Sequence, residues 1–282
     1  MELQRIYIDT HVHIYGIYET RKMLETVYNH FMSYIHSEES SHGCIFCLVL
    51  TEAQSEDYFS RLLDETWYEE YAPQWYPRRT AEDSSLWICQ DDHIKILVIA
   101  GRQIVTRENL EVLALGSAVR YEDGRAIYDV IKQLRDEGVI VVLPWGFGKW
   151  WFGRGRTIRQ VIETSGPGDI YLGDSRLRPA TCCNTDIFQL ARSRGIGILQ
   201  GSDPLPLAGQ ESVIAGYGMV LHGDFDHDNP ISSLKYLLAD VDSHATTFGG
   251  HASIMEVAGL QVRMFLHNQA KKLLKKVGMK RT

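Results

Sequence analysis

Two histidines stand two residues apart at the end of the first apolar run of the chain. Residues 6–13 read IYIDTHVH, and side chains alternate along a strand, so Asp9, His11 and His13 share one face. Neutral imidazoles placed in this way can chelate one cation, and Zn, Mn and Fe all accept them. The spacing therefore predicts a divalent metal site with one or two ions. The alternative is a structural or solvent-exposed pair, because a lone H-x-H is a common pattern.

Acidic residues beside other apolar runs could complete such a site. Asp203, Asp174 and Glu111 each stand at, or within three residues of, such a run. Carboxylate oxygens bind the same cations as imidazole nitrogens, so we add these three residues to His11 and His13 as candidate ligands. One of four later histidines could also join the site, although each alone could equally be structural or exposed: His222, His227, His244 and His251.

Cationic residues follow the same apolar runs. Guanidinium groups offer planar pairs of donors that suit phosphate or carboxylate, so several of them at one rim would bind an anion. We expect Arg102 and Arg176 to act in catalysis together with Asp203. The alternative for these charges is solvation or pairing with acidic residues. The residues expected to bind substrate are Gln103, Lys149, Arg154, Arg156, Arg178 and Trp145.

The elements that must position these residues alternate between short apolar runs and helix-like stretches. This alternation is the βα pattern, and continuous apolar strands are typical of parallel sheets. Polar and glycine-rich sequence follows nearly every run, and α/β barrels place active sites at the carboxyl ends of their strands. We therefore expect an α/β fold, a distorted (β/α)7 or TIM-like barrel. The expected strands are 5–13, 44–50, 94–104, 111–115, 139–143, 170–172 and 197–200, with a weak eighth at 218–221, and the expected helices include 125–136, 157–164 and 186–193.

Two segments stand apart within the single domain expected over residues 1–282. Residues 52–92 combine many aromatic side chains with 11 acidic residues, and we interpret them as an excursion after the second strand. The excursion could be a lid or a peripheral packing subdomain. Residues 254–282 have the pattern of a C-terminal helix, and its lysine-rich end suits the helix dipole.

The chain of 282 residues has 29 basic and 36 acidic residues, a net charge of −7. An acidic sum argues against a nucleic-acid-binding protein, which needs a basic footprint, so we expect a small-molecule anionic substrate and no nucleic-acid partner. The sum hides a contrast, because residues 144–178 hold 6 basic and 3 acidic residues. No apolar run reaches 18 residues, so no membrane partner is expected, and five scattered cysteines favour a cytoplasmic protein. A homo-oligomer stays open.

Two motifs resemble those of a known superfamily. Asp9-Thr10-His11-Val12-His13 and Gly201-Ser202-Asp203-Pro204 are similar to the opening and closing motifs of metal-dependent hydrolases with amidohydrolase or PHP (polymerase and histidinol phosphatase) domains. PHP is the closer match, and the resemblance covers most of residues 1–210. It implies a seven-stranded barrel and a bound divalent metal. Three departures argue against a full trinuclear site: Gly101-Arg102-Gln103 replaces Gly-x-Glu, Pro144-Trp145 replaces His-Pro, and Pro204-Leu205 replaces the last histidine.

The function expected from these residues is metal-dependent hydrolysis, with a phosphoester as the first choice. A divalent ion would lower the pKa of a water molecule, and Asp203 or a nearby carboxylate would accept its proton. Hydrolysis of a C–N or C–O bond, in an amide, lactone or cyclic imide, is the first alternative. A non-catalytic anion-binding protein on a degenerate barrel is the second.

Overall fold

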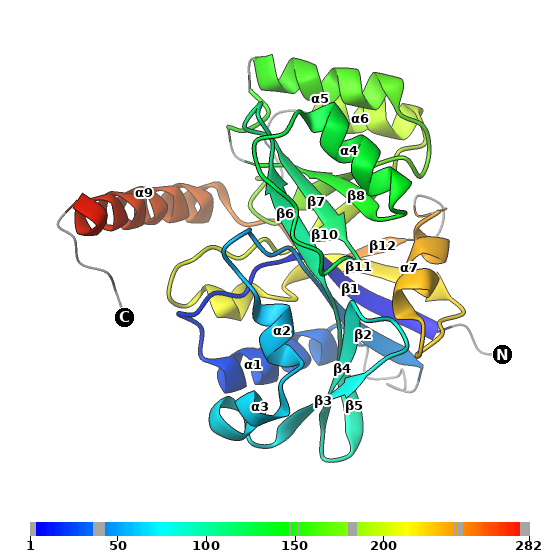
Figure 1. Cartoon of the computed structure of the whole chain (residues 1–282), viewed down its shortest axis with the longest axis vertical. Coiled ribbons are helices and arrows are strands. Elements are labelled where there is room, and N and C mark those ends of the chain that lie inside the picture. Colours follow the sequence, from blue (N-terminus) through cyan, green and yellow to red (C-terminus); the bar gives the residue numbers. More distant parts are fainter. Residues whose placement is uncertain are drawn as a thin grey trace.

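The computed structural model describes residues 4–35, 43–146, 148–151, 153–179, 185–239, 241 and 245–276. Strands in these ranges form two sheets (Figure 1). The larger sheet has the order β12-β11-β1-β2-β5-β4-β3, with β12 Thr246–Gly249, β11 Tyr217–Gly223, β1 Gln4–Val12, β2 Cys44–Leu50, β5 His93–Ile99, β4 Ser85–Gln90 and β3 Trp75–Arg79. The smaller sheet has the order β10-β9-β8-β7-β6, with β10 Ile198–Gly201, β9 Tyr171–Ser175, β8 Ile140–Pro144, β7 Glu111–Leu115 and β6 Gly101–Val105.

The expected α/β class is confirmed, but the closed barrel is wrong. Each sheet is mixed: β1, β2 and β5 run parallel, as do β8, β9 and β10, whereas β4 pairs antiparallel with β5 and β7 pairs antiparallel with both β6 and β8. Antiparallel ladders interrupt the all-parallel order that a TIM-like barrel requires. The strands therefore divide into two sheets.

The single strand expected at 94–104 is in fact two strands, one in each sheet. The chain leaves β5 at Ile99 and enters β6 at Gly101. A Cβ atom at Gly101 would lie 2.2 Å from the carbonyl oxygen of Leu50, so the backbones approach as closely as only glycine permits. Glu52 and Arg102 form a parallel bridge at this seam, and β1 lies beside β10 elsewhere. Among the described residues, the two sheets are thus connected at this seam by an isolated bridge and not by a continuous ladder.

The sheets share a core because both turn an apolar face inward. One buried cluster contains Ile8 and Leu97 from the larger sheet with Leu113 and Val142 from the smaller one. Helices cover the outer faces. In Figure 1, α4 (Ile127–Asp136), α5 (Gly153–Thr164) and α6 (Thr185–Ser193) gather around the smaller sheet. The amphipathic spacing of Ile127, Val130, Ile131 and Leu134 explains why α4 buries that face.

The other helices lie around the larger sheet or extend from the body. α1 (Thr20–Ser33), α2 (Tyr58–Leu62) and α3 (Glu65–Tyr71) lie at the opposite end from α4–α6, and α7 (Pro230–Leu238) lies near β11 (Figure 1). A short 3-10 helix covers Gln210–Val213. α9 (Ile254–Lys276) extends away from the sheets, and residues 277–282 of the expected C-terminal helix lie outside the described residues. Within the described ranges, every helix is too short or too polar to cross a membrane.

Residues 52–92 form α2, α3, β3 and β4. Their buried side chains, among them Phe59, Leu62 and Tyr68, pack in the same cluster as Met23 and Leu24 of α1. β3 and β4 extend the edge of the larger sheet by antiparallel pairing. The segment is thus part of the main core, and a lid role for it stays a prediction.

Candidate metal centre

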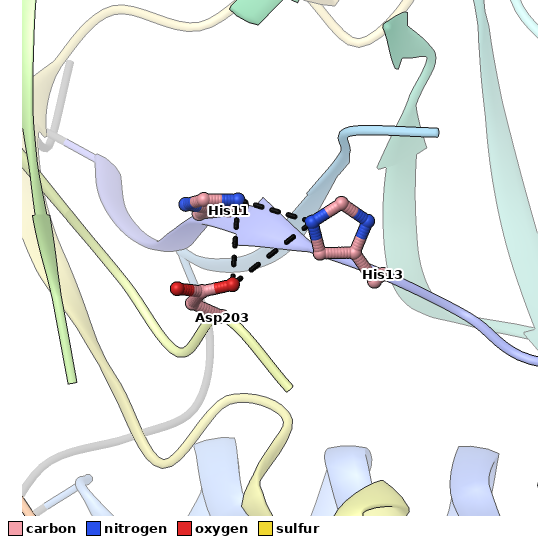
Figure 2. Close-up of side chains that lie close together, drawn as sticks. All are labelled: His11, His13 and Asp203. Carbon is pink, nitrogen blue, oxygen red and sulfur yellow. Dashed lines mark hydrogen bonds and ion pairs between the residues drawn. The ribbon is translucent and has the colours of Figure 1, made fainter. Parts of the chain in front are cut away.

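His11, His13 and Asp203 point toward one another (Figure 2). The two Nε2 atoms are 3.2 Å apart, and Asp203 Oδ1 lies 3.6 Å from His11 Nε2 and 4.0 Å from His13 Nε2. Both histidines are 5% exposed. A tetrahedral ion with bonds of about 2.0–2.1 Å holds its ligand atoms about 3.3 Å apart. The separations of 3.2 and 3.6 Å are close to this value, whereas the 4.0 Å separation between Asp203 and His13 is longer. Within the described part of the chain, this is the only place where three or more histidine, cysteine or carboxylate side chains lie close enough to hold one ion.

Close backbone contact brings Asp203 to the histidines. The Asp203 backbone N–H donates to the His11 carbonyl oxygen at 2.9 Å, which fixes the loop after β10 against the end of β1. A Cβ atom at Gly201 would lie 2.4 Å from His11 Cβ, so the glycine of the Gly-Ser-Asp motif is required for this approach. Asp203 itself has a φ of +50°, in the left-handed region that aspartate tolerates better than most residues.

Asp9 connects the strand that carries His11 with the loop that carries Asp203. Its carboxylate accepts backbone N–H groups from His11 at 3.2 Å, Ser202 at 2.8 Å and Ala215 at 3.0 Å. Burial raises the pKa of Asp9 to about 7 despite these hydrogen bonds. Because its oxygens bind backbone groups on both sides, Asp9 ties β1 to the Asp203 loop and is not itself a ligand candidate.

The two imidazoles are neutral at physiological pH. Burial lowers the pKa of His11 to about 4 and, together with the neighbouring His11, lowers that of His13 to about 3. A neutral imidazole has a free lone pair, which is the form that binds a metal ion. Nδ1 of His13 is buried without a hydrogen-bond partner among the described residues. Two neutral nitrogens and one carboxylate oxygen thus form a donor set that fits Zn, Mn or Fe.

A second group of polar residues lies next to the histidines. Glu111 Oε1 accepts a hydrogen bond from Gln103 Nε2 at 3.1 Å, and it forms an ion pair with Lys149 Nζ. Glu111 raises the pKa of His11, whereas Lys149 lowers the pKa of both imidazoles, and Gln103 raises that of His13. Gln103, Glu111 and Lys149, which were predicted as site residues, therefore lie close to the centre.

Asp174 lies one residue before Ser175, whose hydroxyl donates to Asp203 Oδ2 at 2.9 Å. The carboxylate of Asp174 accepts hydrogen bonds from Nε and Nη2 of Arg178, at 2.6 and 2.8 Å. It also contacts the Tyr217 hydroxyl at 2.9 Å and His251 Nε2 at 3.1 Å. Burial raises the pKa of Asp174, but hydrogen bonds from Arg178 and His251 outweigh burial and hold it below its usual value. Asp174 and Arg178 thus pair with each other beside the centre.

The other predicted residues lie in different surroundings. Arg102 is buried and donates to Glu52 at 2.9 Å and to the carbonyl oxygens of Glu56 and Ala118, which engages its guanidinium at the seam between the sheets. Trp145 is buried in the core under α4 and α5. The remaining cations lie as follows: Arg176 pairs with Glu256 at 2.8 Å, Arg154 donates to the Gly148 carbonyl, and Arg156 is exposed on α5.

Among the later histidines that the structure describes, His251 alone contacts predicted site residues, which are Asp174 and Arg178. His222 is exposed on β11, and His227 stacks on Trp87 with 5.0 Å between ring centroids. His244 lies outside the described residues. The sequence pattern of a lone histidine could not separate these cases.

Sequence reasoning missed two tyrosines beside the centre. The Tyr15 ring stacks on His13 with centroids 5.7 Å apart, and Tyr15 packs edge-on against Tyr18. The Tyr18 hydroxyl donates to the Leu205 carbonyl at 2.6 Å, two residues beyond Asp203. Tyr15 stands two residues after His13, as His13 stands two residues after His11, and this spacing in the sequence could have identified it. A cavity of about 500 Å³ adjoins Tyr18 and is lined by further aromatic side chains: Tyr58, Trp67 and Tyr71.

No protein-family model matches the sequence, and a search of curated proteins finds no match. Among solved structures, the chain is similar to PsfC from Pseudomonas syringae PB-5123, with 12% identity and a TM-score of 0.54 over 96% of this chain and 99% of that one. It is also similar to the lesion-specific endonuclease PfuEndoQ from Pyrococcus furiosus, with 10% identity and a TM-score of 0.50. That alignment covers 84% of this chain, which spans 56% of the length of the endonuclease. A complex of Endonuclease Q with a 27-mer duplex substrate, with an abasic lesion at the active site, aligns at 9% identity and a TM-score of 0.47 over 85% of this chain and 57% of that one.

These likenesses show a shared fold, and they correct one expectation. The expectation of a small anionic substrate with no nucleic-acid partner is wrong as an inference from net charge, because the chain shares its fold with a lesion-specific endonuclease. The net charge of −7 is a sum over the whole chain, whereas the segment 144–178 carries an excess of basic residues. An acidic sum therefore does not exclude a polyanion at one face.

Proposed function

We propose that the chain is a metal-dependent hydrolase that cleaves phosphodiester bonds in nucleic acid. The observation that carries the proposal is the buried cluster of His11, His13 and Asp203. The fold, shared with a lesion-specific endonuclease, and the motifs that resemble PHP domains support the same class of reaction. In this proposal, Nε2 of each histidine and Oδ1 of Asp203 hold one divalent ion of the Zn, Mn or Fe type.

A divalent ion in this position would lower the pKa of a water molecule toward neutrality and polarise a phosphoryl oxygen. The residues of the chain provide the remaining functions. His11 and His13 stay neutral and are held in place by their burial. Asp203 accepts the proton of the attacking water at its carboxylate, and Ser175 orients that carboxylate through Oδ2.

The surroundings of the cluster suit a nucleic-acid strand. Bases stack on aromatic side chains regardless of sequence, and the cavity beside Tyr18 has tyrosine and tryptophan side chains in its walls. Tyr71 is 49% exposed, so its ring is available for such contacts. We propose that a phosphodiester lies at the metal cluster while a neighbouring base lies in the aromatic cavity.

The test is hydrolysis of end-labelled oligonucleotides by the purified protein with added Mn²⁺ or Zn²⁺. Single-stranded, duplex and abasic duplex substrates are compared with an aryl ester and an amide, because the same cluster could also hydrolyse carboxyl derivatives. We expect metal-dependent cleavage of at least one oligonucleotide, and a loss of more than about 100-fold in His11→Ala and His13→Ala. His222→Ala, which changes an exposed histidine on β11, is the matched control and should cleave normally. Turnover of the ester or amide alone, or equal cleavage by His11→Ala, would refute the proposal.

A further inference from the structure

We infer that Lys149, held by Glu111, is a fixed positive charge at the metal centre and that the centre holds a single metal ion. The inference rests on the proposed function and names a further catalytic residue and the number of ions. It begins with the second ligand candidates. Glu111 and Asp174 were predicted to hold a metal ion, and a second ion would need such carboxylates.

Glu111 already binds two donors of the protein. Its Oε1 atom accepts a hydrogen bond from Gln103 Nε2 at 3.1 Å and forms an ion pair with Lys149 Nζ. The Glu111 side chain is 16% exposed, so little solvent competes with these contacts. The ammonium group therefore neutralises a carboxylate that a second cation would need as a ligand.

The position of Lys149 is built into the loop after β8. Its backbone N–H donates to the Gly146 carbonyl at 2.9 Å, which closes a turn. The side chain then runs back over Gly146, where a Cβ atom would lie only 2.6 Å from Lys149 Cδ. A glycine at 146 thus leaves the space through which Lys149 reaches Glu111 on β7.

Contacts between neighbouring segments place this group beside the histidines. Thr51 Oγ1 lies 3.5 Å from His13 Nε2, and the backbone N–H of Gln103 donates to the carbonyl oxygen of Glu52, the residue after Thr51, at 2.9 Å. The Gln103 side chain, from β6, contacts the Glu111 carboxylate that pairs with Lys149. The three residues from β6, β7 and the loop after β8 therefore form one group against the cluster.

Asp174 is neutralised in the same way. Arg178 donates to both of its oxygens, at 2.6 and 2.8 Å. Among the predicted carboxylate ligands, all of which lie in the described ranges, Asp203 pairs with histidines, whereas Glu111 pairs with a lysine and Asp174 with an arginine. Lysine and arginine side chains thus pair with the two carboxylates that could hold a second ion. His11, His13 and Asp203 remain as ligands for one ion.

Lys149 can also contact the substrate. Its side chain is 38% exposed, and an ammonium group has three N–H donors, of which Glu111 uses one. A phosphodiester bound at the cluster would present its non-bridging oxygens to the remaining donors. A fixed cation there stabilises the negative charge that develops on these oxygens during hydrolysis, as a second metal ion does in two-metal enzymes.

The experiment measures metal content and phosphate binding, so that it does not depend on activity alone. Elemental analysis gives the ions per chain after loading with Mn²⁺ or Zn²⁺ and desalting, and calorimetry gives the affinity for inorganic phosphate. We expect one ion per chain in the wild type and in Lys149→Arg, which keeps the positive charge beside Glu111. We also expect phosphate affinity to fall at least tenfold in Lys149→Met and to recover in Lys149→Arg. Lys132→Met, which removes an exposed lysine from α4, is the matched control and should leave both quantities unchanged.

The outcomes separate the two proposals. Two ions in the wild type, with one lost in Glu111→Gln, would make Glu111 a metal ligand and overturn this inference while the proposed function stands. Unchanged phosphate affinity in a folded Lys149→Met protein would overturn it as well. A wild-type chain that binds no ion would overturn the proposed function and this inference with it.

Discussion

A methyl group at position 201 should open the candidate metal centre. Gly201 is the last residue of β10, and a Cβ atom there would lie 2.4 Å from His11 Cβ and 2.6 Å from the His11 backbone nitrogen. The second contact is with backbone, so a side-chain rotation cannot relieve it. In Gly201→Ala, β10 must therefore move away from β1.

The size of the movement follows from these contacts. Ordinary van der Waals contact begins near 3.4 Å, so the contact at 2.4 Å must lengthen by about 1 Å. Asp203 lies two residues further along the same segment, so the shift of β10 strains its 2.9 Å hydrogen bond to the His11 carbonyl and displaces its carboxylate. Metal sites tolerate errors of about 0.2 Å in ligand distances. The expected movement exceeds that tolerance about fivefold, and we expect metal affinity to fall by at least about 100-fold.

Competition with a chromophoric chelator measures this affinity, and thermal unfolding shows whether the variant is folded. Overpacking costs about 1–3 kcal/mol, which a chain of this size should survive. Gly259→Ala is the control, because a Cβ atom at this α9 residue meets nothing within 4 Å. A folded Gly201→Ala protein that binds the ion as tightly as the wild type would refute the claim that this close approach sets the geometry of the centre.

Three further predictions concern the support of the centre and the stability of the fold. Ser175→Ala removes the hydroxyl that orients the ligand carboxylate, so chelator competition should show metal affinity reduced about 10- to 100-fold with little change in unfolding. Arg102→Met leaves the buried carboxylate of Glu52 without its ion-pair partner, which should cost about 3–5 kcal/mol in chemical denaturation, and retained stability would contradict the structural role of this pair. The metal-free protein should lose stability as the pH falls from about 6.5 toward 4, because the unfolded chain then binds protons that His11 and His13, with folded pKa values of about 4 and about 3, still exclude. The slope should reach about 1.4 kcal/mol per pH unit for each imidazole, and His13→Gln should reduce it; an unchanged slope would contradict the burial argument.

The sequence predicted individual strands better than their arrangement. The apolar runs 44–50 and 111–115 are strands β2 and β7 with the expected bounds, because a continuous apolar run must be buried whatever its partner is. The direction of pairing is not encoded in such a run, so the antiparallel partners of β7 could not be foreseen. The run 94–104 also gave no sign that it changes sheet at Ala100.

The same limit applies to the charged residues. The structure brings His11, His13 and Asp203 together as the motifs indicated, because strand alternation and a glycine-containing turn are local properties. Arg102 looked like a residue of an anion site, yet its partner Glu52 lies 50 positions away in the sequence. Residue type shows that a cation is present, but only the tertiary contacts show whether another side chain has already bound it.

The origin of the ligands has a consequence for how the protein is held together. His11 belongs to β1 of one sheet and His13 directly follows that strand, whereas Asp203 follows β10 of the other sheet. An ion bound by all three would act as a clip across two sheets that share no hydrogen-bonded ladder, and it would close a chain segment of about 190 residues. Such a ligand at 100 times its Kd adds about 2.7 kcal/mol to stability. The supply of metal would then regulate the lifetime of the folded chain against proteolysis as well as its chemistry.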